Sequence, residues 1–294
     1  MAEFGATVAI DAQLLRAWPL PRPGDAADKE ERGATLVIAG SAEMPGAAAL
    51  GATSALRAGA GKTAVATVAA IAPGIALRLP EARVIAMAET EAGGIAADAM
   101  AKVEAQLAKV DAVLIGPGLQ DAAATRAFTR RILEQATHAA VVVDALAMDA
   151  VLDVGRFERM PLLTPHAGEM AHLTGATKEA VSADPERHAR EAASRWNAVV
   201  ALKGATTYIA TPDGDCWRHV SSQAGLGTSG SGDVLAGIIV GLAARGASLA
   251  QAAVWGVALH ARAGRALAER IGPIGYLAGE LPAEIPILLA KLAH

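Results

Sequence analysis

Cysteine and aromatic residues are both scarce in this chain of 294 residues. A single cysteine, Cys216, excludes an intramolecular disulfide and is compatible with a reducing cytosol. Aromatic residues make up only 3% of the sequence and hydrophobic residues 53%, so we expect a closely packed aliphatic core. We expect Cys216 to be one of its small buried hydrophobic residues.

An excess of charge and long apolar runs are also missing. Thirty acidic residues against twenty-six basic ones give a net charge of −4 without a basic block, which argues against nucleic acid as a partner. The first residues lack a basic region followed by an apolar run, and no purely apolar window reaches about 18 residues. We therefore expect no secretory signal and no membrane partner, and a soluble, cytoplasmic protein.

Composition changes near residue 32. Residues 1–32 are polar and interrupted by proline, which predicts a solvated lead-in, whereas residues 33–294 show no repeat, low-complexity tract or long linker. We expect this second part to form a single domain.

Short apolar runs alternate with helix-like segments in that part. The alternation predicts an α/β fold with a mainly parallel sheet flanked by helices, and Asp213-Gly214 predicts one hairpin. Loops that follow parallel strands meet at one edge of the sheet, so we expect them to share a cleft. The expected strands cover residues 35–40, 63–68, 111–119, 139–145, 161–164 and 199–204, and the main expected helices 41–61, 96–110, 122–137, 185–197, 249–271 and 284–292.

The stretch Gly225 to Gly241, GLGTSGSGDVLAGIIVG, combines a glycine-rich loop with the start of an apolar helix. Four glycines within eight residues let backbone N–H groups converge, and the first N–H groups of a helix have no internal partners. Together they predict an anion site, with Asp233 at its centre. The alternative is that Asp233 only caps the helix, but a cap does not need four glycines.

Two familiar phosphate-binding patterns do not hold. Gly225, Gly227 and Gly230 spell G-x-G-x-x-G, but no apolar strand precedes them and no acidic residue follows at the required distance. GAGKT at residues 59–63 lacks the first glycine of a P-loop, and the helix and strand around it stand in the reverse order.

The expected cleft carries one cation, Lys203, one imidazole, His166, and the carboxylates of Asp144, Glu169 and Asp233. This set suits phosphoryl transfer, in which positioning and charge stabilisation supply most of the catalysis. A carboxylate at a helix start can accept a proton from a substrate hydroxyl while N–H groups stabilise the transferring phosphoryl group.

We predict no protein metal cage and no nucleophilic triad. His166 and Glu169 form an isolated HxxE pair, so Mg²⁺ would be held through nucleotide phosphates and waters. Ser229 and Ser231 lack a nearby base in the sequence, and we expect them to be small loop formers.

Five motifs, in their order, resemble the ADP- or ATP-dependent NAD(P)H-hydrate dehydratases of the ribokinase-like superfamily, over about residues 33–290. SGSGD alone would indicate only a ribokinase-like kinase, and its combination with PHAGE and IGPGL separates this family from sugar and vitamin kinases. The resemblance implies a three-layer ribokinase-like sandwich. The motifs are AGSAEMPGAAALGATSALRAGAGK, IGPGL, LTPHAGE, VVALKGATTYIATPDGD and SGSGDVLAGI.

The resemblance also implies a reaction. Hydrated NADH or NADPH (NADHX or NADPHX) is phosphorylated on its added hydroxyl by ADP or ATP with Mg²⁺, and elimination of phosphate restores the reduced cofactor. ADP is the expected donor, with AMP released. Family members commonly form homotetramers, and we expect any epimerase to be a separate protein, since the chain lacks room for that domain.

Residue roles carry over from matching motif positions. Asp233 would be the base, and Gly230, Ser231 and Gly232 would form the anion hole. The adenine nucleotide would contact Lys203, Gly204, Ala205, Thr206, Thr207 and Gly232, and the hydrate would contact Ala48, Gly118, His166 and Asp233. Each has a plainer alternative: Gly118 could end a strand, His166 cap a helix, Lys203 be solvated and Ala48 be packing.

Some positions depart from the family pattern. DALAMD replaces the usual DADALN, so Leu146 stands for an aspartate and Asp149 for an asparagine, and Gln223 and Ser229 also differ. Two other functions therefore stay open: a ribokinase-like kinase for a vitamin precursor or sugar, and a nucleotide-binding protein without catalysis.

Overall fold

The computed structural model describes residues 5–22, 24, 28–221 and 223–292, and its centre is one ten-stranded sheet in the order β1-β10-β9-β8-β7-β6-β5-β2-β3-β4. Every neighbouring pair is parallel except β8 with β9 and β9 with β10, which form the predicted hairpin. The strands are β1 (Val8–Ala9), β2 (Ala34–Ile38), β3 (Lys62–Val68), β4 (Arg83–Met87), β5 (Ala112–Ile115), β6 (Ala140–Val143), β7 (Leu162–Leu163), β8 (Val199–Leu202), β9 (Thr206–Ala210) and β10 (Cys216–Val220).

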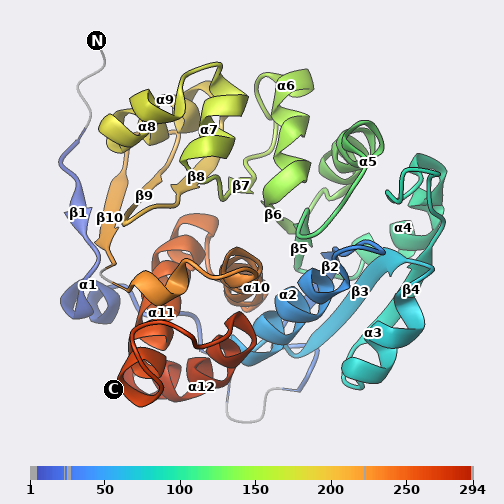
Figure 1. Ribbon diagram of the computed structural model, residues 1–294, viewed down its shortest axis with the longest axis horizontal. Helices are drawn as coiled ribbons and strands as arrows, with labels where there is room; N and C mark the ends of the chain where they lie inside the picture. The colour runs from blue at the N-terminus through green and yellow to red at the C-terminus, as the bar shows by residue number, and fades with distance from the viewer. Residues whose placement is uncertain (1–4, 23, 25–27, 222, 293–294) are drawn as a thin grey trace.

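Helices cover both faces of the sheet (Figure 1). Two separate clusters of buried aliphatic side chains lie between the sheet and the two helix layers, which confirms the predicted α/β sandwich. One layer holds α1 (Ala12–Ala17), α2 (Pro45–Arg57), α3 (Ala72–Arg78), α10 (Ser231–Ala244), α11 (Leu249–Arg270) and α12 (Leu281–Leu292). The other holds α4 (Ala101–Leu107), α5 (Ala122–Gln135), α6 (Val151–Val154), α7 (Ala167–Thr174), α8 (Lys178–Ala183) and α9 (Pro185–Trp196).

Helix α10 is buried on all sides, because it lies between the sheet, α2 and α11. Its small residues allow this: a Cβ on Gly237 would lie 2.3 Å from the carbonyl oxygen of Gly51 in α2. Of its fourteen residues, only Gly232 and Asp233 are not buried. A helix that is apolar all round therefore presents one polar end.

The amino-terminal segment corrects one prediction. Residues 1–32 were expected to be solvated, but β1 pairs with β10, and Leu15 of α1 is fully buried. Trp18 stacks on Trp217 with ring centroids 5.5 Å apart, and its carbonyl accepts a hydrogen bond of 2.8 Å from the Trp255 indole. The lead-in prediction is thus wrong for the stretch from Val8 to Trp18, while residues 1–4, 23 and 25–27 lie outside the described residues.

Helix α3 and strand β4, which sequence analysis did not predict, extend the sheet beyond β3. In the described part of the chain, no helix has the length and apolar character to cross a membrane.

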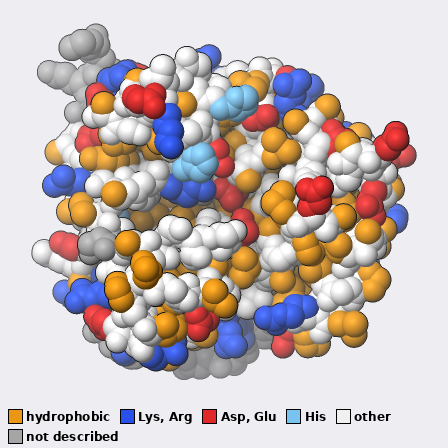
Figure 2. All heavy atoms as spheres, in the orientation of Figure 1, with side chains coloured by type: hydrophobic (Ala, Val, Ile, Leu, Met, Phe, Trp, Pro, Cys, Tyr) orange, Lys and Arg blue, Asp and Glu red, His pale blue; other side chains and the backbone are white. Residues whose placement is uncertain are grey.

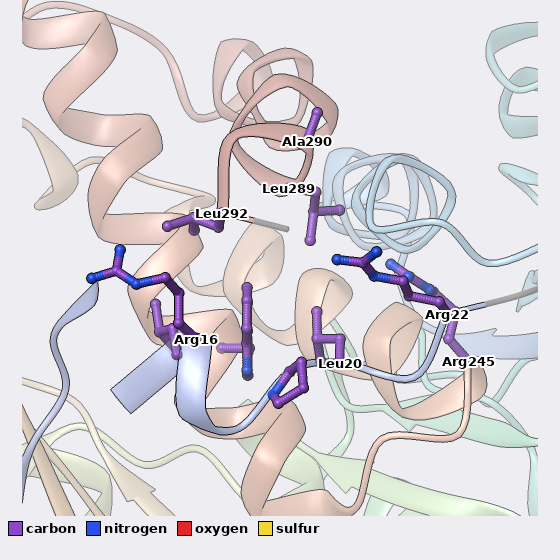
Figure 3. A pocket seen from close by; sticks show the side chains of 10 residues that line it. Arg16, Leu20, Arg22, Arg245, Leu289, Ala290 and Leu292 are labelled. Carbon is purple, nitrogen blue, oxygen red and sulfur yellow. The ribbon is translucent and has the colours of Figure 1, made fainter. Parts of the chain in front are cut away.

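A cavity of about 530 Å³ lies between the segment after α1 and the end of α12, with arginine side chains at its rim (Figure 3).

Candidate active site

Three of the loops expected to share a cleft, those at His166, at Lys203 to Thr207 and before α10, meet around a cavity of about 690 Å³, whereas the loops after β2, β5 and β6 do not line it. Lys203, just after β8, donates its N–H to the carbonyl of Pro165 (2.7 Å), and His166 and Lys203 pair as a short parallel bridge. Figure 2 shows histidine, lysine or arginine, and acidic side chains gathered at a hollow near the middle of this face. The lining residues are His166, Lys203, Gly204, Ala205, Thr207, His219, Ser221, Gln223, Ala224, Leu226, Gly227, Thr228, Ser231, Gly232, Leu235, Val257, His260 and Ala261.

Lys203 is held by carboxylates rather than by solvent. Its Nζ donates to Asp144 Oδ1 (3.0 Å) and lies 4.0 Å from Glu169 Oε2. Asp144, which is buried at the end of β6, also accepts a hydrogen bond of 2.6 Å from Thr164 Oγ1. Burial alone would lower the pKa of Lys203, but Asp144 and Glu169 outweigh it and raise that pKa. The solvated alternative for Lys203 is therefore excluded.

Asp233 occupies the third position of α10 with a pKa raised to about 6. Burial is the largest cause, the negative charge of Asp144 adds to it, and the positive charge of Lys203 opposes it. Within the described residues its carboxylate caps no N–H group of the helix, so the capping alternative does not hold. A carboxylate with this pKa is ionised at neutral pH yet is a better proton acceptor than an exposed aspartate.

The turn before α10 depends on one glycine. Gly230 has φ +86°, and a Cβ there would lie 2.5 Å from Leu50 of α2. The sequence predicted unusual backbone angles at four glycines, but Gly225, Gly227 and Gly232 do not have positive φ. Gly225 instead makes room for Tyr276, whose ring lies 2.5 Å from where a Cβ would stand.

Only some of the backbone N–H groups in the predicted anion hole are available to a ligand. The N–H of Ser231 donates to the carbonyl of Thr228 (3.2 Å), and the N–H of Val234 donates to that of Gly230 (3.1 Å). Over the described residues, the backbone N–H groups of Gly232 and Asp233 have no backbone acceptor. Two backbone donors at the positive end of α10 are therefore available to bind an anion.

The structure brings most of the predicted nucleotide residues together. Lys203, Gly204, Ala205, Thr207 and Gly232 line the cavity. Thr206 does not line it, because side chains alternate along strand β9 and only its neighbour faces that way.

Of the predicted hydrate contacts, His166 lines this cavity, whereas Ala48, Gly118 and Asp233 are not among its lining residues. His166 lines it and also caps α7, since its Nδ1 accepts the N–H groups of Gly168 (3.0 Å) and Glu169 (3.1 Å). Ala48 is fully buried in α2 and packs beside Gly40. Gly118 abuts the start of the same helix, where a Cβ would lie 2.6 Å from that of Ala47. The capping role of His166 and the packing role of Ala48 are thus seen in the structure, and no part of Ala48 is exposed.

A neighbouring cavity of about 480 Å³ is lined by two of the four departures from the family pattern. Leu146 lines it, and Asp149 Oδ1 lies 3.1 Å from His172 Nε2 there. His166 lines both cavities. These two departures therefore lie beside the main cavity, whereas Gln223 lines the main cavity itself and Ser229 stands in the turn before α10.

Sequence analysis missed one polar contact in the main cavity. His260 Nε2 of α11 lies 3.0 Å from Ser231 Oγ, and both side chains are buried. Ser231 has no base nearby in the sequence, and the imidazole beside it comes from a different helix, 29 positions away. A histidine within an apolar helical run was the available signal.

Comparisons with known proteins agree with this geometry. The family model of the NAD(P)H-hydrate dehydratases matches residues 35–287. The chain is 47% identical to the ADP-dependent (S)-NAD(P)H-hydrate dehydratase of Xanthomonas campestris pv. campestris, covering 96% of each. It is 38% identical to the bifunctional NAD(P)H-hydrate repair enzyme Nnr of Moorella thermoacetica, covering 95% of this chain and 54% of that protein.

Solved structures give the same result. The crystal structure of the ADP/ATP-dependent NAD(P)H-hydrate dehydratase from Bacillus subtilis, co-crystallised with ATP and Mg²⁺, superposes with a TM-score of 0.82 at 28% identity, over 97% of this chain and 99% of that one. The fold, the buried carboxylate at the start of α10 and these matches lead to one conclusion: the chain belongs to the NAD(P)H-hydrate dehydratase family.

Proposed function

We propose that the protein is an ADP-dependent (S)-NAD(P)H-hydrate dehydratase, which returns hydrated NADH or NADPH to the reduced cofactor and releases AMP and phosphate. The observation that carries this proposal is the position of Asp233: burial raises its pKa, and it stands beside two backbone N–H groups that have no backbone acceptor among the described residues. The similarity to the Xanthomonas enzyme, which covers nearly the whole chain, supports the choice of substrate and donor.

Asp233 and the start of α10 perform the first step. The hydroxyl oxygen of the hydrated ring bonds to the β-phosphorus of ADP, the bond to the AMP oxygen breaks, and Asp233 takes the hydroxyl proton. The N–H groups of Gly232 and Asp233 stabilise the charge on the transferring phosphoryl group. Phosphate then leaves the ring, a ring proton is lost, and the carbon–carbon double bond is restored.

Lys203 contributes a fixed positive charge to the same site. Asp144 and Glu169 raise its pKa, so it stays protonated across the physiological range and offsets negative charge on the nucleotide. We assign the nucleotide site to Lys203, Gly204, Ala205, Thr206, Thr207 and Gly232, with Thr206 contributing through its backbone.

Mg²⁺ would be held mainly by the nucleotide. The described residues include no cluster of three or more histidine, cysteine or acidic side chains suited to a metal ion, whereas Asp233 and Asp144 are near the proposed phosphate position. Phosphate oxygens and waters would complete the coordination, and the ion would supply charge neutralisation.

The hydrate is proposed to contact His166, Gly118 and the backbone of Ala48, on the side of Asp233 away from the adenine nucleotide. We also propose a cytoplasmic homotetramer that receives its substrate from a separate epimerase. Bifunctional relatives are about twice as long as this chain, which supports an epimerase acting in the same repair process. Sedimentation of the purified protein tests the tetramer.

A direct assay tests the reaction. Purified protein is incubated with enzymatically hydrated NADH and ADP, and recovery of the near-ultraviolet absorbance of reduced nicotinamide is followed together with AMP release. We expect recovery that depends on ADP. Phosphorylation of a sugar or vitamin precursor without recovery would instead establish the kinase alternative, and nucleotide binding without either reaction would establish a non-catalytic protein.

A further inference from the structure

A buried hydrogen bond joins the anion site to the neighbouring helix. His260 of α11 is 9% exposed, Ser231 of α10 is 5% exposed, and their Nε2 and Oγ atoms are 3.0 Å apart. Both residues line the cavity assigned to the nucleotide. Ser231 is the first residue of α10, two positions before Asp233, so its hydroxyl lies at the reacting end of the site.

The backbone of Ser231 cannot serve an incoming phosphoryl group. Its N–H already donates to the carbonyl of Thr228 at 3.2 Å. The one remaining donor of this residue is its hydroxyl proton, whose direction depends on the partner of Oγ. That partner is His260.

His260 is a neutral imidazole in this position. Burial lowers its pKa to about 4, and the positive charge of Lys203 acts in the same direction. A neutral imidazole has one N–H group and one lone pair, so Nε2 either donates to Ser231 Oγ or accepts from it. If Nε2 accepted, the lone pairs of Oγ would face the cavity and repel a phosphate; if Nε2 donates, the hydroxyl proton is free to point toward it.

We propose that His260 is a positioning residue, whose Nε2–H donates to Ser231 Oγ and so directs the Ser231 hydroxyl proton at the phosphoryl group that ADP transfers. This inference rests on the proposed phosphoryl transfer and adds a side-chain donor to the N–H groups of Gly232 and Asp233. His260 acts only through Ser231, which is the residue that contacts the phosphoryl group.

A double-mutant cycle tests the pair. Ser231→Ala and His260→Leu are each expected to lower kcat by about 10²- to 10³-fold, which is the effect of losing one oxyanion donor in other enzymes. The double variant should be no worse than Ser231→Ala, because both changes remove one interaction. A further loss of kcat on adding His260→Leu to Ser231→Ala would overturn the proposal.

Two further variants separate positioning from stability. His260→Gln keeps an N–H donor and should retain kcat within about threefold, as the hydrogen bond is preserved. Gln251→Leu is the matched control, because Gln251 is also buried on α11 but donates to the carbonyl of Pro19 (2.9 Å) far from the cavity. It should lower Tm without lowering kcat. If His260→Gln is as inactive as His260→Leu, the role is merely structural.

Nucleotide affinity gives a readout that does not depend on turnover. Calorimetry of Ser231→Ala should show weaker binding of ADP but unchanged binding of AMP, because only ADP carries the phosphoryl group that is transferred. His260→Gln should bind both nucleotides as the wild type does. Equal losses for ADP and AMP would overturn the proposal even if His260→Leu fails to fold. A wild-type protein that binds ADP but does not restore NADH would instead contradict the proposed function.

Discussion

Two cavities of similar size have opposite chemistry. The cavity behind α1 and α12, about 530 Å³, has apolar walls and arginines, and Arg245 donates to the carbonyls of Ala58 (2.9 Å) and Pro21 (3.2 Å) (Figure 3). Arg245 therefore links the segment that follows α1 to the end of α2. In the cavity proposed to bind the nucleotide, about 690 Å³, Lys203 is paired with carboxylates, and the N–H groups of Gly232 and Asp233 have no backbone acceptor in the part of the chain that the structure describes.

The difference shows that volume does not identify a catalytic site. Burial keeps the pKa of the carboxylate at the start of α10 raised, although the positive charge of Lys203 opposes the shift. The ionised carboxylate therefore lowers the stability of the fold but is available as a proton acceptor. Arg245 has no such arrangement, and its donors serve the fold. We therefore expect changes in the cavity lined by Lys203 to alter activity and changes in the arginine-lined cavity to alter only stability.

Asp233→Asn should give the largest effect. The amide cannot accept the hydroxyl proton, so kcat should fall by about 10²- to 10⁴-fold, the range typical of a positioned base. Binding of ADP should persist, because the N–H groups of α10 remain. Single-turnover kinetics together with calorimetry measures both. Unchanged turnover in this variant would refute the assignment of Asp233 as the base.

Lys203→Met and Arg245→Met compare the two cations directly. Loss of Lys203 leaves Asp144 buried without its ion-pair partner, so we expect a loss of about 3 kcal/mol in unfolding free energy and at least about 100-fold in kcat. Arg245→Met removes two hydrogen bonds to backbone carbonyls and should cost about 1–3 kcal/mol with kcat preserved. Urea unfolding and steady-state kinetics test this. Equal losses of kcat would show that the arginine-lined cavity also serves catalysis.

The same Asp233→Asn variant should be more stable than the wild type above pH 6. The pKa of Asp233 is about 6 in the folded state and near 3.8 unfolded, so the folded state binds more protons between these values. Its contribution to stability is present below about pH 4 and is lost as the pH rises through about 6. Removing the charge should add on the order of 1–3 kcal/mol at pH 8 and nearly nothing at pH 4. Urea unfolding at both pH values measures this, and a variant less stable at pH 8 would contradict it.

Sequence reading located Asp233 because its signal is local. Gly230, Ser231 and Gly232 stand beside it, and an apolar helix follows at once, so spacing alone predicts the loop and the helix start. His260 was missed because its contact with Ser231 spans 29 positions and exists only through packing of α11 on α10.

Longer-range pairings could not be read for the same reason. Asp144 and Lys203 were each placed after a strand, but their ion pair depends on β7 lying between β6 and β8 in the sheet. Strand β1 has two residues, too few to show a period of two, and its partner β10 lies about two hundred positions away. Periodicity therefore gave the elements, and tertiary packing decided their partners.

The pH dependence of activity should follow Asp233. Turnover requires the ionised carboxylate, so kcat/KM should fall about tenfold per pH unit below pH 6. Asp144→Asn removes a negative charge that raises the pKa of Asp233, so the acid limb should move to lower pH. A pH profile of each protein measures this. An acid limb that stays in place would show that another group controls the reaction.

Two matched substitutions give the smallest and most direct test of the comparison. Leu226 lines the nucleotide cavity, and Leu289 lines the cavity behind α12; both are partly buried. Leu226→Phe places a larger side chain where ADP is proposed to bind and should raise its KM about tenfold, the size of a 1.4 kcal/mol clash. Leu289→Phe should leave KM and kcat within about twofold, because small shape changes in a remote cavity are absorbed locally. A rise in the KM for ADP with Leu289→Phe and none with Leu226→Phe would mean that the nucleotide binds in the arginine-lined cavity.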